Sequence, residues 1–362
     1  MVVLPVFDEL TIESHKGRYT ACLNETAFED LCAMDSDSLH FIVDDHVAEV
    51  YRDELAGVLH SPSVVLVTAE ENNKSLEKMP VFVEQLITQN VRRDHTLIAI
   101  GGGIIQDITC FLSATLLRGI DWAFYPTTLL AQADSCIGSK SSINAGTAKN
   151  ILGTFTPPRR VTIDTRFLST LSDRDLRSGI GEIIKVHIID GPKSFADIAG
   201  NFDRLFTDPA VLQRHIHHAL MVKKRYIEED EFDQGPRNIF NYGHSFGHAI
   251  EAATEFAVPH GIAVTIGMDM ANWISAQFGV GTLDHYHRMS PTLRTNAAEF
   301  NAVPVPIEPF LAALAKDKKN VGQGTVSLIL PDRDARVFKG VYDNDGRFHD
   351  LCSNYFNEVR TT

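Results

Sequence analysis

Three short apolar segments, each followed by a helical pattern, constrain the fold of this chain more than any other feature. The apolar segments are 39–43, 63–68 and 96–100, and the helical patterns are 46–58, 75–89 and the stretch after the glycines that ends at 117. A strand followed by a helix, repeated in this way, is typical of a parallel sheet covered by helices. Ligands of such sheets bind beyond the carboxyl ends of the strands. Residues that directly follow these segments are therefore the first candidates for function.

A glycine triplet, Gly101, Gly102 and Gly103, follows the third apolar segment. Glycines permit backbone conformations closed to other residues and let a pyrophosphate approach closely, with a helix N-terminus behind them. We therefore expect a phosphate-binding turn whose natural ligand is a dinucleotide, although the spacing is not GxGxxG and a tight turn without a ligand is the alternative. Asp107, one turn into the helix, is placed to meet a ligand hydroxyl or is an ordinary solvated acid.

The segment 134–150, DSCIGSKSSINAGTAKN, is rich in polar and charged residues and follows a strand-like segment at 122–125. Its lysines, Lys140 and Lys149, lie among small residues, which suits a phosphate or carboxylate ligand. A solvated polar loop is the alternative. The formal net charge of the chain is −14, so an anion needs a local concentration of positive charge such as this one.

Composition excludes several classes of function. A net charge of −14 without a basic run argues against nucleic-acid binding and against an anionic membrane surface. No stretch approaches about 18 uninterrupted apolar residues, so we expect no membrane span. The five cysteines are scattered without a CxxC motif, and no signal peptide is apparent. Reduced thiols and a cytoplasmic location are therefore expected.

The second half of the chain has a helical pattern from 172 to about 277, so we place a domain boundary near 165. Glu182 and Lys185 are three residues apart in an apolar helix, where a surface ion pair is the alternative to a buried site. Four polar residues recur at spacings of four, three and four, which predicts one stripe on one helix face: Arg237, Asn241, His244 and His248. His260 follows. Imidazoles with a carboxylate suit zinc or a similar ion, and hydrogen-bonded core histidines are the alternative.

Seven short motifs occur in a fixed order: GGG-x3-D, RG, PTTLLAQ-x-DS, K-x8-KN, GEIIK, R-x3-NYGH-x3-H and HG. In this order they closely resemble the 3-dehydroquinate synthases and the wider sugar-phosphate cyclases, over about residues 40–330. The resemblance implies an α/β Rossmann-like NAD-binding domain over 1–165. It also implies a mainly α-helical domain that binds metal and substrate over 166–362.

The resemblance also implies the residues of the site. NAD would be held by Asp44, Glu71, Lys74, Gly102, Gly103, Asp107, Thr127, Thr128 and Lys149. Zinc or cobalt would be held by Glu182, His244 and His260. The substrate would be bound and processed by Arg118, Asp134, Lys140, Asn150, Lys185, Lys223, Arg237, Asn241 and His248. His248 would thus serve the substrate or proton transfer, and not the metal. Lys318 or Lys319 would add one more cation.

The implied activity is that of a phosphate-eliminating lyase of the shikimate pathway of aromatic amino acid biosynthesis. It would convert 3-deoxy-arabino-heptulosonate 7-phosphate to 3-dehydroquinate as a homodimer. Departures from the family pattern at Gln106, Ser139, Ser142 and Ile262 leave open a cyclase for an amino analogue or a heptulose phosphate. Two further hypotheses are an NAD- and metal-dependent polyol or alcohol dehydrogenase and an inactive binding protein. The number of cations favours a phosphate- and carboxylate-bearing substrate.

Overall fold

The computed structural model describes residues 9–34, 36–146, 148–317, 320 and 324–360. Two compact units divide these residues. Unit 1 contains the described residues up to Leu171 together with Ile216–Phe232, and unit 2 contains Ser172–His215 and the described residues from Asp233 on. The break between the units thus follows Leu171, and part of one long helix, α8 (Pro209–Glu229), returns to unit 1.

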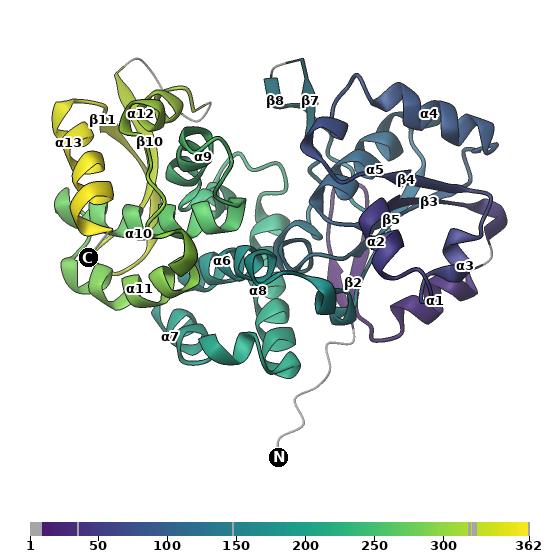
Figure 1. Ribbon diagram of the computed structural model, residues 1–362, viewed down its shortest axis with the longest axis horizontal. Coiled ribbons are helices and arrows are strands. Elements are labelled where there is room, and N and C mark those ends of the chain that lie inside the picture. The colour runs from purple at the N-terminus through teal and green to yellow at the C-terminus, as the bar shows by residue number, and fades with distance from the viewer. Residues whose placement is uncertain (1–8, 35, 147, 318–319, 321–323, 361–362) are drawn as a thin grey trace. The chain divides into compact units, whose positions relative to one another are not determined.

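Unit 1 is built on a seven-stranded sheet with the order β1-β2-β9-β6-β5-β3-β4 (Figure 1). Its strands are β1 (Leu10–Ile12), β2 (Tyr19–Leu23), β3 (Leu39–Asp44), β4 (Val64–Val67), β5 (Thr96–Gly101), β6 (Asp121–Pro126) and β9 (Arg160–Ile163). All neighbouring strands pair in parallel except β1 and β2, which form an antiparallel hairpin. The predicted parallel sheet is confirmed, because β3, β4, β5 and β6 are almost continuously apolar.

The helices of unit 1 are α1 (Ala27–Ala33), α2 (Asp45–Val50), α3 (Ala56–Leu59), α4 (Met79–Thr88) and α5 (Gly103–Thr115). The single helix predicted over 46–58 is wrong, because α2 ends at Val50 and a turn separates it from α3. Tyr51 lies at this break. Its ring packs against Phe28 and Phe167, and its hydroxyl donates to the carbonyl of Phe167 (3.0 Å), which anchors the chain there.

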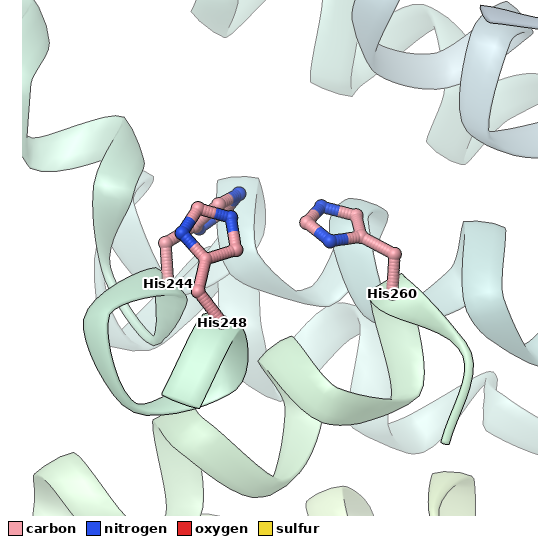
Figure 2. Close-up of side chains that lie close together, drawn as sticks. All are labelled: His244, His248 and His260. Carbon is pink, nitrogen blue, oxygen red and sulfur yellow. The ribbon is translucent and has the colours of Figure 1, made fainter. Parts of the chain in front are cut away.

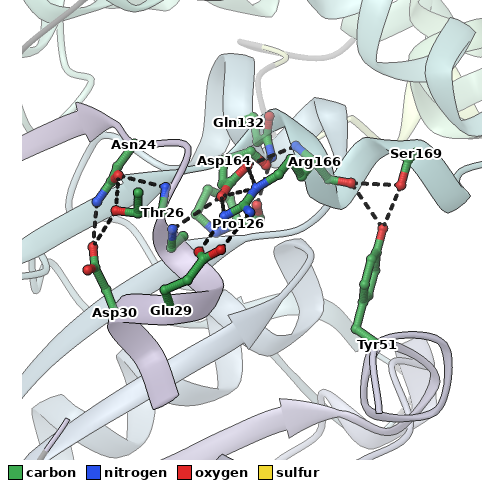
Figure 3. A network of polar contacts seen from close by, with 11 residues as sticks. Asn24, Thr26, Glu29, Asp30, Tyr51, Pro126, Gln132, Asp164, Arg166 and Ser169 are labelled. Atoms are coloured by element: carbon green, nitrogen blue, oxygen red, sulfur yellow. Dashed lines mark hydrogen bonds and ion pairs between the residues drawn. The ribbon is translucent and has the colours of Figure 1, made fainter. Parts of the chain in front are cut away.

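The carboxyl ends of β6 and β9 are joined by a polar network (Figure 3). The side-chain amide of Gln132 donates to the carbonyls of Pro126 (3.0 Å) and Asp164 (2.8 Å). The carboxylate of Asp164, which is wholly buried, accepts from Arg166 (Nη2 to Oδ2 2.7 Å), and Arg166 also binds Glu29 of α1. The ends of two central strands are therefore fixed relative to each other and to α1.

Unit 2 is mainly helical, with α6 (Asp173–Asp190), α7 (Pro192–Gly200), α9 (His244–Ala253), α10 (His260–Gln277), α11 (Leu283–Asn296), α12 (Ile307–Ala315) and α13 (Gly346–Asn354). One hairpin, β10 (Thr325–Pro331) and β11 (Val337–Asp343), packs with them. Helix α10 is buried along nearly its whole length and contacts α6, α9 and α11. It is the centre of this unit (Figure 1).

The stripe predicted over 237–248 does not lie on one helix. Arg237 and Asn241 lie on a short 3-10 helix, η7 (Pro236–Asn241), whereas His244 begins α9. Gly243 separates them with φ +78°, and a Cβ there would lie 2.6 Å from Cγ of Met268. The prediction is wrong because the close packing of Gly243 on α10 imposes a left-handed turn that spacing alone does not reveal.

The segment 134–150 has more structure than a plain loop. It begins in a π-helical turn, η4 (Ala131–Ser135), and then forms a short hairpin of β7 (Ile143–Ala145) and β8 (Ala148–Leu152). No helix among the described residues is long and apolar enough to cross a membrane.

Candidate functional site

The carboxyl edge of the sheet in unit 1 gathers several of the predicted cofactor residues. Strand β5 passes through Gly101 and Gly102 into α5, and β6 passes into Thr127 and Thr128. The Thr127 amide donates to the Gly101 carbonyl (2.9 Å), and a Cβ on Gly102 would lie 2.9 Å from Cγ2 of Thr128. Side chains at Gly101 and Gly102 would therefore crowd Ile105 and Thr128, and the first amides of α5 lie directly behind the turn, as an anion site requires.

Asp44 lies at the same edge, at the end of β3, and caps α2 by accepting from the His46 amide (3.1 Å). The side chain is mostly buried, and burial raises the pKa of its carboxyl above the ordinary value although the His46 amide opposes this. Because β3 and β5 pair in parallel and in register, Asp44 and the glycine turn lie at neighbouring strand ends.

The buried ammonium of Lys74 is the centre of a partly exposed polar network. Its Nζ lies 3.2 Å from Oδ2 of Asp107, 3.0 Å from Oδ1 of Asn150 and 3.5 Å from Oε1 of Glu71. Burial raises the pKa of the Asp107 carboxyl, and the nearby Lys74 ammonium acts in the opposite direction. Three predicted NAD residues thus lie together, and they are joined by Asn150, which the resemblance placed on the substrate side. Lys149 lies next to Asn150 on β8 and is exposed.

Lys223, on α8, binds the segment that contains Asp134. Its Nζ lies 2.5 Å from Oδ1 of Asp134 and also donates to the Asp134 carbonyl oxygen. Lys223 is 7% exposed, so the carboxylate compensates a charge that would be costly to bury alone. Lys140 is more exposed and lies in the same segment, where it forms an isolated β-bridge with Phe155.

Arg118 is the predicted site residue that unit 1 does not bring to this edge. It lies in the turn between α5 and β6, before β6 begins at Asp121, with φ +67°. The glycine turn and Thr127 follow the carboxyl ends of their strands. The amino ends of parallel strands lie at the opposite edge of the sheet from their carboxyl ends. Arg118, which precedes the amino end of β6, is therefore separated from the other candidates of this unit. Lys318 and Lys319 lie outside the described residues.

Three histidines of unit 2 converge (Figure 2). His244 and His248 lie one turn apart on α9, and His260 begins α10. One nitrogen from each ring lies within 4.8 Å of the others. Figure 2 shows the two α9 rings on one side and the His260 ring pointing toward them from the other. Such a cluster has the composition of a transition-metal site.

Glu182, on α6, adds a carboxylate to this cluster. Its Oε1 lies 3.5 Å from Nε2 of His260 and 3.7 Å from Nε2 of His244. Its Oε2 lies 2.5 Å from Nζ of Lys185, and both side chains are almost fully buried. The sequence left a surface ion pair as the alternative for Glu182 and Lys185, and burial excludes it.

Helix packing explains why these donors meet. A Cβ on Gly261 would lie 1.9 Å from the carbonyl oxygen of Ser178, so α6 and α10 cross at van der Waals contact. Gly261 directly follows His260, and Glu182 is one turn beyond Ser178 on α6. The close crossing therefore brings Glu182 and His260 together. Helix α9 approaches α10 through Gly243 in the same way.

Glu251 is a residue that the sequence motifs did not single out. Both of its carboxylate oxygens lie 3.3 Å from Nδ1 of His260. Burial lowers the pKa of His260, but the hydrogen bond to Glu251 and the charges of Glu251 and Glu182 outweigh it, so the pKa is raised. A carboxylate behind a metal-binding imidazole fixes its orientation. The sequence feature that could have identified Glu251 is its spacing, because it follows His248 by three residues on α9.

Arg237 and Asn241 are carried by η7, which packs against α6. Arg237 is 7% exposed, and the Asn241 side chain donates to the Asn238 carbonyl (3.1 Å). Between them in sequence, the Phe240 ring lies 5.7 Å from Nζ of Lys185. Unit 2 therefore places the Lys185 ammonium beside the candidate ligand Glu182 and carries Arg237 on an element that packs against the same helix.

The departures from the family pattern differ in their surroundings. Ile262 is wholly buried in α10, so it belongs to the packing between helices and not to the donor cluster. Gln106 binds Ser135 of the segment 134–150. Within that segment, the Ser142 hydroxyl donates to Oδ1 of Asn150 (2.6 Å).

Comparison with known proteins gives consistent results. Family models described as 3-dehydroquinate synthase N-terminal and C-terminal match residues 64–178 and 179–320. A 3-dehydroquinate synthase from Mesorhizobium japonicum is 34% identical over 301 residues, 80% of this chain and 79% of its own length. One from Dictyoglomus turgidum is 34% identical over 335 residues, 91% of this chain and 93% of its own length.

Solved structures show the fold. A 2-deoxy-scyllo-inosose synthase complexed with carbaglucose-6-phosphate, NAD+ and Co2+ has a TM-score of 0.82 at 22% identity, covering 97% of this chain and 99% of its own. A 2-epi-5-epi-valiolone synthase from Streptomyces hygroscopicus with NAD+ and Zn2+ has a TM-score of 0.81 at 24% identity, covering 94% and 97%. A glycerol dehydrogenase from Schizosaccharomyces pombe has a TM-score of 0.62 at 15% identity, covering 98% and 92%.

Proposed function

The chain belongs to the 3-dehydroquinate synthase family, and we propose that it converts 3-deoxy-arabino-heptulosonate 7-phosphate to 3-dehydroquinate with release of phosphate. It is a phosphate-eliminating cyclase, a lyase that uses NAD and a divalent metal ion. The observation that carries the proposal is the cluster of three imidazoles and Glu182 beside the buried Lys185. A metal-dependent step on an anionic substrate requires both parts.

The donor set fits zinc or cobalt. Ligand atoms about 2.1 Å from a tetrahedral ion are about 3.4 Å from one another. The Glu182 oxygen lies 3.5 Å from the His260 nitrogen and 3.7 Å from the His244 nitrogen, so little adjustment is needed. We assign Glu182, His244 and His260 as ligands and His248 to the substrate. When bound, the metal ion lowers the pKa of a substrate hydroxyl.

Unit 1 fits NAD as a Rossmann-like nucleotide-binding domain. Gly102, Gly103 and the first amides of α5 would hold the pyrophosphate. The remaining expected contacts come from residues near the carboxyl edge of the sheet, namely Asp44, Glu71, Lys74, Asp107, Thr127, Thr128 and Lys149. When bound, NAD would supply a reversible hydride acceptor that is not consumed overall.

The chain's own residues then bind and orient the substrate. Lys140 and Lys223 in unit 1, and Lys185 and Arg237 in unit 2, are the cations for phosphate and carboxylate. Asp134 holds the ammonium of Lys223 in place (2.5 Å), and Glu182 does so for Lys185 (2.5 Å). Asn241 and Asn150 offer side-chain amides for substrate oxygens. An imidazole can both accept and donate a proton, and we assign proton transfer to His248.

We extend the proposal to a homodimer in the cytoplasm. Among the described candidates of unit 1, Arg118 is the one whose place in the site the fold of this unit does not explain. Its position at the opposite edge of the sheet from the glycine turn separates it from the other residues of unit 1. Size-exclusion chromatography with light scattering tests the dimer.

A panel of phosphorylated substrates tests the reaction. The purified protein with NAD and zinc should release phosphate from 3-deoxy-arabino-heptulosonate 7-phosphate, and NMR should identify 3-dehydroquinate as the product. Faster release from an amino analogue or a heptulose phosphate would reassign the substrate within the same reaction class. Absence of phosphate release from every member of the panel would contradict the proposal.

A further inference from the structure

Gln106 makes two hydrogen bonds to a single residue of the neighbouring segment. Its Nε2 donates to the Ser135 carbonyl oxygen (2.6 Å), and its Oε1 accepts from the Ser135 hydroxyl (2.6 Å). Gln106 lies in the first turn of α5 and is 5% exposed. Ser135 is the last residue of the π-helical turn η4. Both hydrogen-bonding groups of one glutamine are therefore committed to one partner.

The next residue of α5 binds the other end of the same segment. Oδ1 of Asp107 accepts from the Ser142 amide (2.9 Å). Gln106 and Asp107 thus fix residues 135 and 142, and Lys140 lies between these two points. Asp134, which binds Lys223, directly precedes the first of them. The first turn of α5 therefore supports the part of unit 1 that contains the candidate phosphate cations.

The conformation at Ser135 needs such support. The η4 turn is closed by the Cys136 amide donating to the Ala131 carbonyl (2.9 Å), five residues earlier in the chain. This π-type turn is rare and often occurs at functional sites. The two hydrogen bonds between Gln106 and Ser135 stabilise this geometry, because losing either bond leaves a largely buried side-chain amide group without its partner.

We propose that Gln106 is a positioning residue that holds the segment 134–142 in the geometry that binds the phosphate-bearing substrate. This inference rests on the proposed cyclase function. Gln106 acts through Ser135 on Asp134, Lys140 and Lys223 and does not itself touch the substrate. Its loss should therefore weaken substrate binding while the chemical step, once substrate is bound, proceeds at a similar rate.

The test replaces Gln106 by methionine, which fills the same space without an amide. The matched control is Gln89→Met, because Gln89 also donates a side-chain hydrogen bond to a backbone carbonyl, that of Val64 (2.9 Å), at the end of α4 in the same unit. Ser135→Ala and the double variant Gln106→Met/Ser135→Ala complete a double-mutant cycle. The readouts are KM and kcat for phosphate release and hydrogen exchange of the amides at 131–142.

We expect Gln106→Met to raise KM for the sugar phosphate about tenfold and to leave kcat within about twofold of wild type. The size of the KM effect corresponds to the net free energy of the two hydrogen bonds that are lost. The double variant should be no worse than Gln106→Met alone, because both changes remove the same contact. Exchange at 131–142 should accelerate about tenfold. Gln89→Met should change none of these quantities.

A KM for Gln106→Met within about twofold of the wild-type value, or unchanged exchange at 131–142, would overturn the positioning role. Equal effects in Gln89→Met would also overturn it, since they would show a general loss of stability in unit 1. Failure of the wild-type protein to release phosphate has a separate meaning: it removes the proposed function, and the exchange measurement still decides whether Gln106 holds the segment.

Discussion

The imidazoles of His248 and His260 both belong to a cluster whose nitrogens lie within 4.8 Å of one another, so distance alone admits two ligand sets. Their surroundings differ. His260 has Glu182 near Nε2 (3.5 Å) and Glu251 near Nδ1 (3.3 Å). A metal-bound histidine typically has one ring nitrogen at the metal position and a carboxylate that binds the other ring nitrogen. We therefore assign His260 to the metal and His248 to the substrate.

Single substitutions separate these two roles. His260→Ala should be purified without stoichiometric metal, because a ligand is lost. His248→Ala should retain metal and lower kcat by about 10²–10⁴, the usual contribution of a group that transfers a proton. Metal analysis and phosphate-release rates measure both effects. Loss of metal from His248→Ala to the same extent as from His260→Ala would reverse the assignment.

In the proposed metal site, Glu251 would act on the metal through its contact to His260. Glu251→Ala should weaken metal affinity by about 10–100-fold, the effect found when a carboxylate behind a metal-bound histidine is removed. Glu255→Gln, an exposed acid just beyond the end of α9, is the control and should leave affinity unchanged. Competition with a chelating dye measures the affinity. Equal affinity in Glu251→Ala and wild type would show that the contact to His260 is incidental.

At the scale of helices and strands, the sequence predicted what depends on local patterns. The apolar segments ending near Asp44 and Gly101 became parallel strands, because burial on both faces leaves an uninterrupted apolar run. Spacing also placed His244 and His248 correctly one turn apart on a helix. It failed at Gly243, whose left-handed turn is imposed by contact with α10, and sequence spacing carries no information about such a distant contact.

Substitution of Gly243 tests this contact. Gly243→Ala should lower the free energy of unfolding by about 1–2 kcal/mol from backbone strain and by about 1–3 kcal/mol more from overpacking against Met268 and Val264. Gly279→Ala is the control, because Gly279 has φ +71° and nothing lies within 4 Å of its added Cβ. Denaturant unfolding and metal content measure the difference. Equal destabilisation of the two variants would show that packing at Gly243 is not tight.

The link between α1 and β9 gives a prediction for pH (Figure 3). The hydrogen bond from Arg166 lowers the pKa of the Glu29 carboxyl from 4.5 to about 2. A lowered pKa in the folded state stabilises the protein above the unfolded value, and this contribution is lost as pH falls through the folded value. The stability advantage of wild type over Glu29→Gln should therefore be full well above pH 4.5, shrink as the pH falls below 4.5 and be mostly lost at pH 2, and it should be small because the pair is exposed.

Denaturant unfolding of both proteins between pH 2 and pH 7 measures this advantage. An advantage that grows as the pH falls would contradict the assigned ion pair. High salt provides the control, since screening should reduce the advantage at every pH above 4.5.

At the scale of the whole chain, the fold does not decide the reaction. Solved structures of sugar-phosphate cyclases and of a glycerol dehydrogenase are all similar to this fold. The proposed chemistry depends on the side chains: a candidate metal-binding cluster in unit 2 and candidate substrate-binding cations in both units. The order of motifs along the chain predicted the family, whereas the substrate was left open because the departures at Gln106 and Ser142 act through contacts that only the structure reveals.

We expect NAD to act as a catalyst in this reaction and not as a consumed substrate. The most direct measurement follows phosphate and NADH together, with 3-deoxy-arabino-heptulosonate 7-phosphate in large excess over NAD and with zinc present. We predict many phosphates released for each NAD and no net accumulation of NADH. NADH accumulating up to the amount of NAD supplied, without phosphate release, would show an ordinary dehydrogenase and contradict the account.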